Sequence, residues 1–264
     1  MNQLANKRAI VTGASRGLGR GVAEAFLAEG ASVVAVARNI GPLSELAGRS
    51  QHLQLVAADA SDPIVAGKLL GEYSPDVVAL VAGAAPLMRP LHHHTWESFS
   101  LNWNADVRMT FFWLREALLL PLRPGSRVIV MSSGAAIMGS PLSGGYAGAK
   151  ATQRFIADYA SQEARRGGLQ ISVTAVLPKL TPATELGRAA ATAYAARMGV
   201  PEEDYLRQLG RPVTPEIAGA AFVKLAADRD GGAAYLLSAD GLQSLADPGQ
   251  TARQPQPAGA KEER

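Results

Sequence analysis

The feature that most constrains the fold is a series of apolar segments, rich in β-branched residues, that do not alternate with polar residues. Four of them are nearly uniform and cover residues 10–11, 33–36, 77–81 and 128–131. Because neighbouring side chains of a strand point to opposite faces of a sheet, such a strand must be buried on both faces. The sequence therefore predicts a parallel sheet that helices cover on both sides.

Seven strands are predicted, and the segments between them have the apolar spacing of helices. The strands cover residues 8–12, 32–37, 53–58, 77–82, 127–132, 171–177 and 233–237. Asp62 stands before a first-turn proline, as does Thr214, and Thr95 precedes a third candidate helix. Alternating strands and helices predict a doubly wound sheet, whose right-handed crossovers bring the carboxyl ends of the strands to one edge. We expect any catalytic and ligand-binding residues to lie at that edge.

Length and composition limit the classes of protein that remain. The chain has 264 residues, 47% of them hydrophobic, which suits one domain over residues 1–246. Residues 247–264 contain no large apolar side chain and are predicted to form a disordered tail. The absence of cysteine excludes disulfides and thiolate metal sites. The net charge is only +3 and the basic residues are scattered along the chain, which argues against nucleic acid as a partner. No apolar run approaches the roughly 18 residues of a membrane helix, and no signal peptide is visible, so a cytoplasmic protein without a membrane partner is expected.

A glycine-rich turn follows the first predicted strand and opens a helix. Gly13, Gly17 and Gly19 allow a tight turn, close approach of the backbone to a pyrophosphate, and close packing of helix on sheet. The free N–H groups and the dipole at the start of that helix favour a bound phosphate. The residues predicted to bind a dinucleotide here are Gly13, Ser15, Arg16, Gly17, Leu18 and Gly19.

The spacing Gly-x-x-x-Gly-x-Gly resembles that of the short-chain dehydrogenase/reductase family, whose further landmarks follow in order from about Arg8 to Gly241. The resemblance implies an α/β protein with a single doubly wound, Rossmann-type domain and a seven-stranded, mainly parallel sheet. It also implies a nicotinamide cofactor and assembly into a homodimer or homotetramer. The further cofactor contacts that it implies are Asp59, Ala60, Gly83, Pro178 and Thr181. Asp59 has a second interpretation, as a turn residue.

The end of the second strand bears on which nicotinamide nucleotide is bound. Domains that select NAD usually carry a carboxylate there for the ribose 2′-hydroxyl, whereas this chain has Arg38 followed by Asn39. Arg38 and Arg16 could bracket a 2′-phosphate with charge-assisted hydrogen bonds, or they could both be solvated surface residues. NADP is the predicted cofactor.

A tyrosine and a lysine four residues apart are the candidate catalytic pair. On a helix Tyr146 and Lys150 share one face, and an ammonium beside a phenol favours the phenolate. Ser133 lies thirteen residues before Tyr146, which is the family's spacing between its serine and its tyrosine. The resemblance implies reversible hydride transfer between the nicotinamide and a carbonyl or alcohol carbon. Tyr146 would exchange the proton, Ser133 would orient the substrate oxygen, and Lys150 would bind the nicotinamide ribose and lower the tyrosine pKa.

Three departures from the family pattern bear on this hypothesis. The fourth strand ends without the family's two asparagines, so a polar brace of the sheet is missing. The family also has an asparagine in the following helix, as part of a proton relay to the lysine. Two residues could take its position: Asn104 has the same residue type, and Asp106 has the family's spacing. Asp106 is preferred as the catalytic residue. The glycine that normally follows the proline of the sixth strand is replaced by Lys179.

Other polar and aromatic residues have less specific interpretations. His92, His93 and His94 suggest a metal, but consecutive residues do not easily converge on one ion, so a polar loop is preferred and no metal is expected. Trp96, Trp103 and Trp113 are expected to pack instead of forming a binding box. The segment 182–210 resembles the family's mobile, substrate-covering region. Small residues on the tyrosine helix would allow another copy to approach closely; they are Ala147, Gly148 and Ala151.

The leading functional hypothesis is an NADP-dependent oxidoreductase that acts on a small-molecule ketone or secondary alcohol, with reduction as the usual direction. One alternative is a nucleotide-binding regulatory or scaffold protein without turnover, which the missing asparagines motivate. Another is epimerisation or dehydration of a nucleotide-linked substrate, against which the short chain argues. The presence of Ser133, Tyr146 and Lys150 together favours the oxidoreductase.

Overall fold

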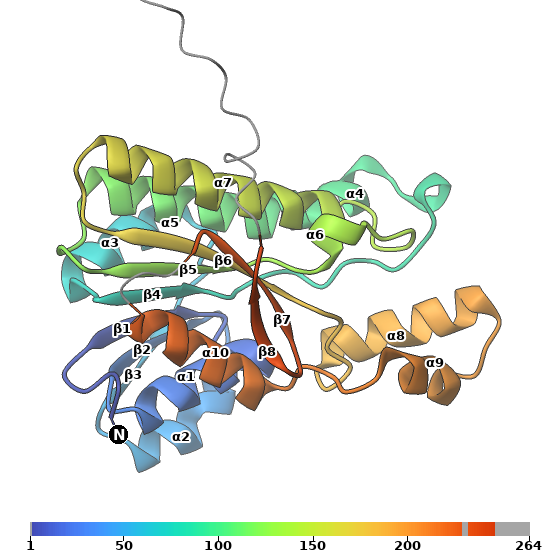
Figure 1. Cartoon of the computed structure of the whole chain (residues 1–264), viewed down its shortest axis with the longest axis horizontal. Helices are drawn as coiled ribbons and strands as arrows, with labels where there is room; N and C mark the ends of the chain where they lie inside the picture. The colour runs from blue at the N-terminus through green and yellow to red at the C-terminus, as the bar shows by residue number, and fades with distance from the viewer. Residues whose placement is uncertain (1, 229–231, 246–264) are drawn as a thin grey trace, which may run out of the picture.

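The computed structural model describes residues 2–228 and 232–245, and it has the α/β architecture of one sheet between two layers of helices (Figure 1). The strands are β1 Arg8–Thr12, β2 Ser32–Ala37, β3 Leu53–Ala57, β4 Val77–Leu80, β5 Arg127–Met131, β6 Ser172–Pro178, β7 Ala234–Ser238 and β8 Gly241–Ser244. The α-helices are α1 Gly17–Ala28, α2 Ser44–Arg49, α3 Pro63–Tyr73, α4 Trp96–Asn102, α5 Arg108–Leu119, α6 Ala135–Met138, α7 Tyr146–Arg166, α8 Glu185–Met198, α9 Glu202–Leu209 and α10 Pro215–Ala227. Two 3-10 turns, η1 Gly41–Leu43 and η2 Leu91–His93, and a π-helical turn, η3 Trp103–Val107, complete the elements.

The strands lie in the order β3-β2-β1-β4-β5-β6-β7-β8, and β1 to β7 are parallel. The predicted doubly wound, mainly parallel sheet is confirmed. The prediction of seven strands was wrong, because β8 pairs antiparallel with β7 and adds an eighth. The segment Gly241–Ser244 has one large apolar residue, Leu242, so its own pattern carries no strand signal, and its pairing with β7 alone makes it a strand.

Several strands end a residue or two away from the predicted bounds. The fourth strand was predicted to reach residue 82, but β4 stops at Leu80. Beyond that point the N–H groups of Val81 and Ala82 donate to the hydroxyl oxygen of Thr12, at 3.0 Å and 3.2 Å. The chain leaves the sheet after Leu80 because the Thr12 hydroxyl binds these N–H groups, which would otherwise bond to a neighbouring strand.

Two apolar cores explain why the strand sequences do not alternate. Helices α1, α2 and α10 cover one face of the sheet, and α3, α5 and α7 cover the other (Figure 1). Within β1, Ala9 and Val11 belong to the first core, while Ile10, between them, belongs to the second. Every residue in the middle of the strand is therefore buried, as the sequence predicted.

The predicted helix starts are confirmed by their caps. The Asp62 carboxylate accepts the N–H of Ile64 at 2.8 Å and caps α3, and Thr214 caps α10 in the same way. Thr95 forms a reciprocal capping box with Ser98 at the start of α4. None of the helices within the described ranges is long and apolar enough to cross a membrane. The predicted tail at 247–264 lies outside the described residues.

The tryptophans and histidines occupy different environments. Trp113 is fully buried, and its indole N–H donates to the carbonyl oxygen of Ala60 at 2.9 Å, so it packs as predicted. Trp96 and Trp103 pack only in part, since they are 77% and 39% exposed. The Trp96 ring stacks on that of Phe99, with the ring centroids 5.9 Å apart, and Trp103 lies against Gly148 of α7. The ring of His94 bonds to Ser98 and is half-buried. No group of three metal-ligating side chains occurs among residues 2–228 and 232–245.

Candidate active site

The glycine-rich turn between β1 and α1 has a backbone that leaves no room for side chains. Gly13 has a φ of +69°, and a Cβ at this position would lie 2.6 Å from the Cα of Ala82. A Cβ on Gly19 would lie 2.2 Å from the carbonyl oxygen of Gly13. Gly17, with a φ of +55°, is in the left-handed region that favours glycine. The three glycines therefore bring the turn close against the segment that follows β4 and against its own helix.

The start of α1 has the features that a phosphate requires. No described side chain caps α1, whereas Asp62, Thr184 and Thr214 cap α3, α8 and α10. The first-turn N–H groups of α1 and the positive end of its dipole are left for an anion. The residues predicted from the sequence all lie in this turn or in the first helical turn; they are Gly13, Ser15, Arg16, Gly17, Leu18 and Gly19. The turn therefore fits the pyrophosphate of a dinucleotide.

The polar groups around this turn make contacts within the chain. Arg16 and Arg38 are both exposed, and Arg16 forms an ion pair with Glu185 at the start of α8. The Asp59 carboxylate accepts the N–H of Ser61 at 2.9 Å, and this hydrogen bond, helped by the charge of Arg38, holds the pKa of Asp59 below its ordinary value. Asp59 thus has the geometry of a turn residue, and its contact with an adenine ring stays a prediction.

The candidate catalytic pair lies on the first turns of α7, next to the carboxyl end of β5. The Lys150 ammonium is 5.5 Å from the centre of the Tyr146 ring. The Ser132 hydroxyl donates to the carbonyl oxygen of Lys150 at 2.7 Å, and the Lys150 ammonium donates to the carbonyl oxygen of Met131 at 3.3 Å. Ser133, which is half-buried, is the next residue of the chain. These contacts bring Ser133 to the edge of the sheet where Tyr146 and Lys150 lie.

The Lys150 side chain is buried among acceptors. Its ammonium lies 2.8 Å from the amide oxygen of Gln153 and 3.1 Å from a carboxylate oxygen of Asp106. Burial by itself lowers the pKa of Lys150, but the negative charge of Asp106 and the nearby Tyr146 outweigh it, so the pKa is raised above its ordinary value. Lys150 is therefore an ammonium at neutral pH.

The two candidates for the family's helix asparagine are separated by the π-helical turn η3. Asp106 is fully buried, and one carboxylate oxygen accepts the N–H of Ala84 at 2.8 Å. Asn104 is exposed. A Cβ on Gly83 would lie 3.1 Å from the Asp106 carboxylate, so the backbone after β4 approaches this side chain closely. Of the two, Asp106 is the residue that faces Lys150.

Two polar side chains bind the backbone that follows β4. Thr12 accepts the N–H groups of Val81 and Ala82 through its hydroxyl oxygen. The Asn102 amide donates to the carbonyl oxygen of Ala84 at 2.7 Å. The sequence analysis missed Asn102, and also Gln153 beside the lysine. Both signals were present, because Asn102 lies four residues before the buried aspartate and Gln153 lies three residues after the lysine, which places each pair on one helix face.

The segment after β6 leads back to the glycine turn. The carbonyl oxygen of Pro178 accepts the N–H of Gly134 at 2.8 Å. Thr181, predicted to contact the cofactor, is buried, and its hydroxyl lies 3.2 Å from that of Thr184. Thr184 caps α8, and its methyl group would lie 3.6 Å from a Cβ on Gly17. The start of α8 therefore lies against the candidate phosphate site, which the sequence did not indicate.

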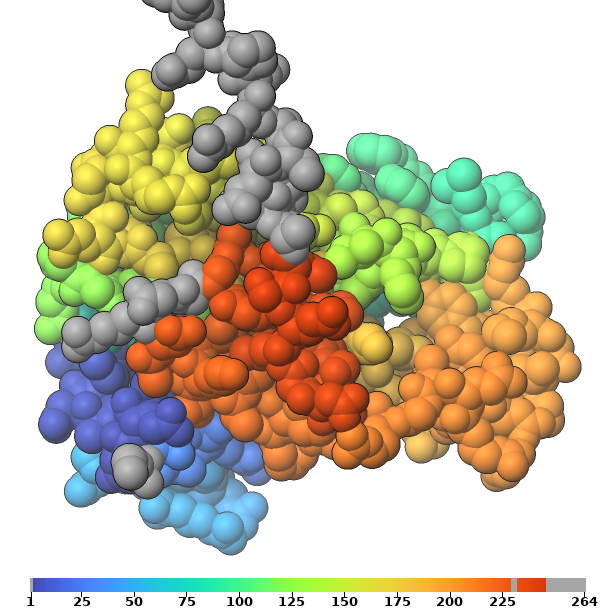
Figure 2. Space-filling model, in the orientation of Figure 1, coloured from blue at the N-terminus to red at the C-terminus, as the bar shows by residue number. Residues whose placement is uncertain are grey.

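The segment predicted to cover the substrate forms α8 and α9, which project beyond the sheet (Figure 1). Tyr194 of α8 forms a hydrogen bond with Ser140, in the loop before α7, and its ring lies 6.2 Å from that of Tyr205 in α9. The surface is hollowed between the segment that contains α6 and the segment that contains α8 (Figure 2). The hydrogen bond between Ser140 and Tyr194 joins the two segments that border this hollow.

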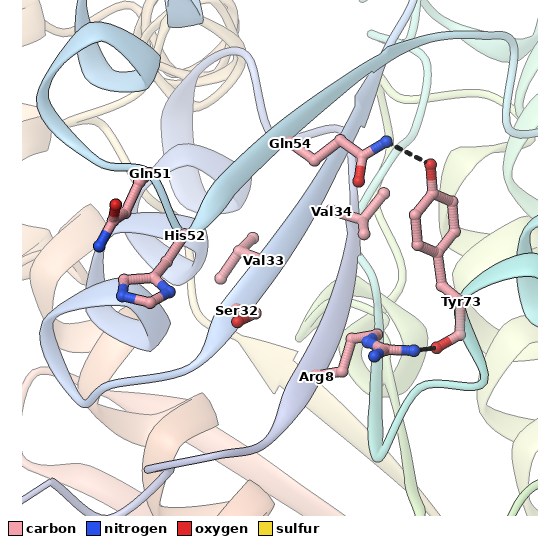
Figure 3. Close-up of a pocket in the computed structure, with 8 residues that line it drawn as sticks. All are labelled: Arg8, Ser32, Val33, Val34, Gln51, His52, Gln54 and Tyr73. Atoms are coloured by element: carbon pink, nitrogen blue, oxygen red, sulfur yellow. Dashed lines mark hydrogen bonds between the residues drawn. The ribbon is translucent and has the colours of Figure 1, made fainter.

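A cavity of about 220 Å³ lies elsewhere, at the amino ends of β1, β2 and β3 (Figure 3). Its lining residues are Arg8, Ser32, Val33, Val34, Gln51, His52, Gln54 and Tyr73. The Gln54 amide donates to the Tyr73 hydroxyl at 2.6 Å across it. Because the glycine turn and α7 begin at the opposite, carboxyl edge of the sheet, this cavity takes no part in the candidate active site.

Comparisons with known proteins agree with this arrangement. The family model described as short chain dehydrogenase matches residues 7–195. The chain is similar to L-xylulose reductase of Mesocricetus auratus, with 33% identity over 105 residues, which are 40% of this chain and 43% of that protein. It is similar to carbonyl reductase (NADPH) 2 of Sus scrofa, with 35% identity over 104 residues, 39% of this chain and 43% of that protein.

A third relative matches over a longer segment. Hydroxynaphthalene reductase-like protein Arp2 of Metarhizium majus is 32% identical over 187 residues, which are 66% of this chain and 68% of that protein. The matches to L-xylulose reductase and carbonyl reductase span less than half the length of those relatives. All three relatives are named as reductases, which supports an oxidoreductase. Since the family model runs through the glycine turn, the buried aspartate, the tyrosine–lysine helix and the first part of α8, this chain belongs to the short chain dehydrogenase family.

Proposed function

We propose that this protein reduces the carbonyl group of a small organic molecule with NADPH as the cofactor. The observation that carries the proposal is the place of Tyr146, which stands at the first turn of α7, 5.5 Å from a buried ammonium and at the same sheet edge as the glycine turn. The names of the relatives, among them a carbonyl reductase with NADPH in its name, support the same chemistry. A cytoplasmic location stays a prediction of the sequence.

The roles of the polar groups follow from where charge develops. The bound nicotinamide supplies the hydride. As the carbonyl oxygen gains negative charge, Tyr146 donates a proton to it, and Ser133 donates a hydrogen bond that orients it. Lys150 places a positive charge 5.5 Å from the centre of the Tyr146 ring, which stabilises the negative charge that the phenol oxygen acquires as its proton leaves. These interactions act on charge that grows in the transition state, which is where they accelerate a reaction.

The preference for NADP is supported by the two exposed arginines near the phosphate turn and by the absence of a carboxylate after β2. Arg16 and Arg38 would bind the 2′-phosphate, and the uncapped start of α1 would bind the pyrophosphate. This assignment is tested by titrating the protein with NADPH and with NADH separately. Energy transfer from tryptophan to the nicotinamide measures the binding of each nucleotide. We expect NADPH to bind at least tenfold more tightly than NADH. Equal binding would contradict the assignment to Arg16 and Arg38.

The reaction is tested with a panel of carbonyl compounds that includes L-xylulose, which is in the name of one relative. Oxidation of NADPH should depend on Tyr146. We expect Tyr146→Phe to lower kcat by about 10²- to 10⁴-fold, since it removes a general acid. Tyr73→Phe is the control, because Tyr73 lines the cavity at the opposite edge of the sheet. Unchanged turnover in Tyr146→Phe would overturn the proposal, and tight NADPH binding without turnover on the panel would favour the regulatory or scaffold alternative.

A further inference from the structure

The loop that leads into α7 is tied to the segment before α4. The Arg89 N–H donates to the carbonyl oxygen of Leu142 at 2.7 Å, and Arg89 and Ser143 form an isolated parallel bridge. The Tyr146 N–H donates to the carbonyl oxygen of Ser143 at 3.0 Å, at the start of the helix. Since Leu142 and Ser143 are neighbours, backbone hydrogen bonds connect Arg89 with the residue proposed as the proton donor.

The His94 side chain binds the Arg89 end of this connection. Its ring is half-buried, and Nε2 lies 3.2 Å from the carbonyl oxygen of Arg89. Because a carbonyl oxygen only accepts, Nε2 carries a proton and donates this hydrogen bond. Nδ1 lies 2.9 Å from the hydroxyl of Ser98, in the first turn of α4, and that hydroxyl also accepts the N–H of Thr95 at 3.0 Å. Turning the ring over would put carbon atoms at both places, so the two bonds fix its orientation.

The two glycines before Tyr146 lie against the His94 ring and against α4. Gly144 has a φ of +53°, and a Cβ there would lie 2.7 Å from Cε1 and from Nε2 of His94. A Cβ on Gly145 would lie 2.0 Å from the carbonyl oxygen of Phe99. The imidazole ring therefore acts on the loop in two ways, through the hydrogen bond to Arg89 and by direct packing against the backbone.

We propose that His94 is a positioning residue for the reduction: it binds the Arg89 carbonyl oxygen, packs against Gly144, and so fixes the place from which Tyr146 meets the substrate. The inference rests on the proposed function, in which Tyr146 is the proton donor. His94 acts through the loop and touches neither substrate nor cofactor. His92, in the same run of histidines, is exposed.

The position of Tyr146 matters because proton transfer needs a hydrogen bond between the phenol and the substrate oxygen. The two oxygens must come within about 2.6–3.2 Å of each other, and a displacement of about 1 Å can cost about a hundredfold in rate. Loss of the bond to Arg89 loosens the segment that pairs with Ser143, so the start of α7 gains room to move. The glycine turn between β1 and α1 makes none of these contacts, so the binding of NADPH should not change.

The kinetic test compares His94→Gln with His94→Asn. The glutamine amide nitrogen reaches nearly the position of Nε2 and can donate to the Arg89 carbonyl oxygen, whereas the asparagine amide stops at the position of Nδ1. For His94→Asn we expect kcat to fall about tenfold or more and the Kd for NADPH to stay within about twofold, because only the proton donor is displaced. His94→Gln should recover kcat to within about threefold of the wild type. His92→Asn, at an exposed position, is the control and should keep the wild-type kcat.

Two results of this comparison would overturn the proposal. One is an equal kcat in His94→Gln and His94→Asn, whether lowered or unchanged, because the Nε2 hydrogen bond would then have no effect on the reaction. The other is a kcat that follows the melting temperature of the variants and not the presence of the amide nitrogen, which would make His94 merely structural.

A second measurement needs no substrate. In protein labelled with fluorotyrosine, the fluorine resonance of Tyr146, assigned by its loss in Tyr146→Phe, reports the surroundings of the phenol. We expect it to shift or broaden in His94→Asn and to keep its wild-type position in His94→Gln and His92→Asn. An unchanged resonance in His94→Asn would overturn the proposal. If the resonance moves as expected but no carbonyl compound is reduced, the proposed function fails while the positioning of Tyr146 by His94 stands.

Discussion

Thr12 illustrates how one side chain shapes the candidate active site. Its hydroxyl oxygen accepts two backbone N–H groups, those of Val81 and Ala82, and so ends β4 where the chain must pass beneath the glycine turn. Position 13 must be a glycine, because a Cβ there would clash with the backbone of Ala82. The close approach of these two segments therefore depends on a hydroxyl in one and a glycine in the other.

The first prediction concerns the pH dependence of stability through Lys150. Its pKa in the folded protein is raised above 10.5, so the folded state holds this proton more tightly than the unfolded chain does. The stabilisation is fully present below the unfolded pKa and is lost as the pH rises through the folded pKa. Urea unfolding of the wild type and of Lys150→Met should therefore show a difference in free energy that is constant from pH 7 to 9 and narrows above pH 10.5. Lys224→Met, at an exposed position, is the control and should show the same dependence of the free energy of unfolding on pH as the wild type. If the difference in free energy between the wild type and Lys150→Met stayed constant above pH 10.5, the prediction would be wrong.

At the scale of elements, the contact between α1 and α10 is closer than ordinary helix packing. A Cβ on Gly21 of α1 would lie 2.2 Å from the carbonyl oxygen of Pro215, and a Cβ on Gly219 of α10 would lie 2.6 Å from that of Gly21. Both neighbours are backbone, so neither can move without its helix. The two glycines let α10 settle against the helix that carries the phosphate turn.

Gly21→Ala and Gly71→Ala form a matched pair of predictions for this contact. We expect Gly21→Ala to lower the free energy of unfolding by about 1–3 kcal/mol, because overpacking forces the two helices apart. Gly71 lies in α3 with nothing within 4 Å of its Cβ position, so Gly71→Ala should raise stability by about 0.4–1 kcal/mol through the unfolded chain. Urea unfolding measures both. Equal effects of the two substitutions would show that helix propensity, and not the α1–α10 contact, determines the outcome.

The ion pair between the glycine turn and α8 leads to a prediction about the cofactor. Arg16 is paired with Glu185, so a 2′-phosphate must compete with this carboxylate for the guanidinium. Both side chains are largely exposed, and such pairs contribute about 0.2–1 kcal/mol. Glu185→Gln should therefore tighten NADPH binding by up to about fivefold and leave NADH unchanged, as measured by nicotinamide fluorescence. Glu203→Gln, in α9, serves as the control; the same gain for both nucleotides would argue against competition at Arg16.

At the scale of the whole molecule, the outer face of α5 and α7 leaves aromatic rings exposed. Phe111, Phe155 and Tyr159 are 48%, 66% and 55% exposed, and the last two rings lie 6.2 Å apart. Monomers rarely expose large contiguous apolar patches. The sequence analysis expected Gly148 to let another copy approach closely. In the structure a Cβ on Gly148 would lie 3.6 Å from Trp103 of the same chain, so this position faces the protein itself. We propose that a second copy of the chain covers the aromatic rings instead.

The last prediction tests that assembly. Sedimentation velocity should show a dimer or larger species for the wild type and a monomer for Phe155→Glu combined with Tyr159→Glu, because two carboxylates would be buried without partners. Ile64→Glu, at a 74% exposed apolar position on α3, should keep the wild-type assembly. A monomeric wild type would contradict the proposal.

The sequence by itself determined the class of fold, the position of seven strands and the glycine turn, because each depends on a pattern within a short stretch of chain. Uniform apolar runs require burial on both faces, and the caps Asp62, Thr95 and Thr214 act on the next few residues. Contacts between distant segments were decided only by the tertiary structure. The strand β8 depends on its pairing with β7, and the π-helical turn aims Asp106 and not Asn104 at the lysine. Gln153 and Glu185 gain their roles from partners that the fold brings to them, and no local pattern records such a partner.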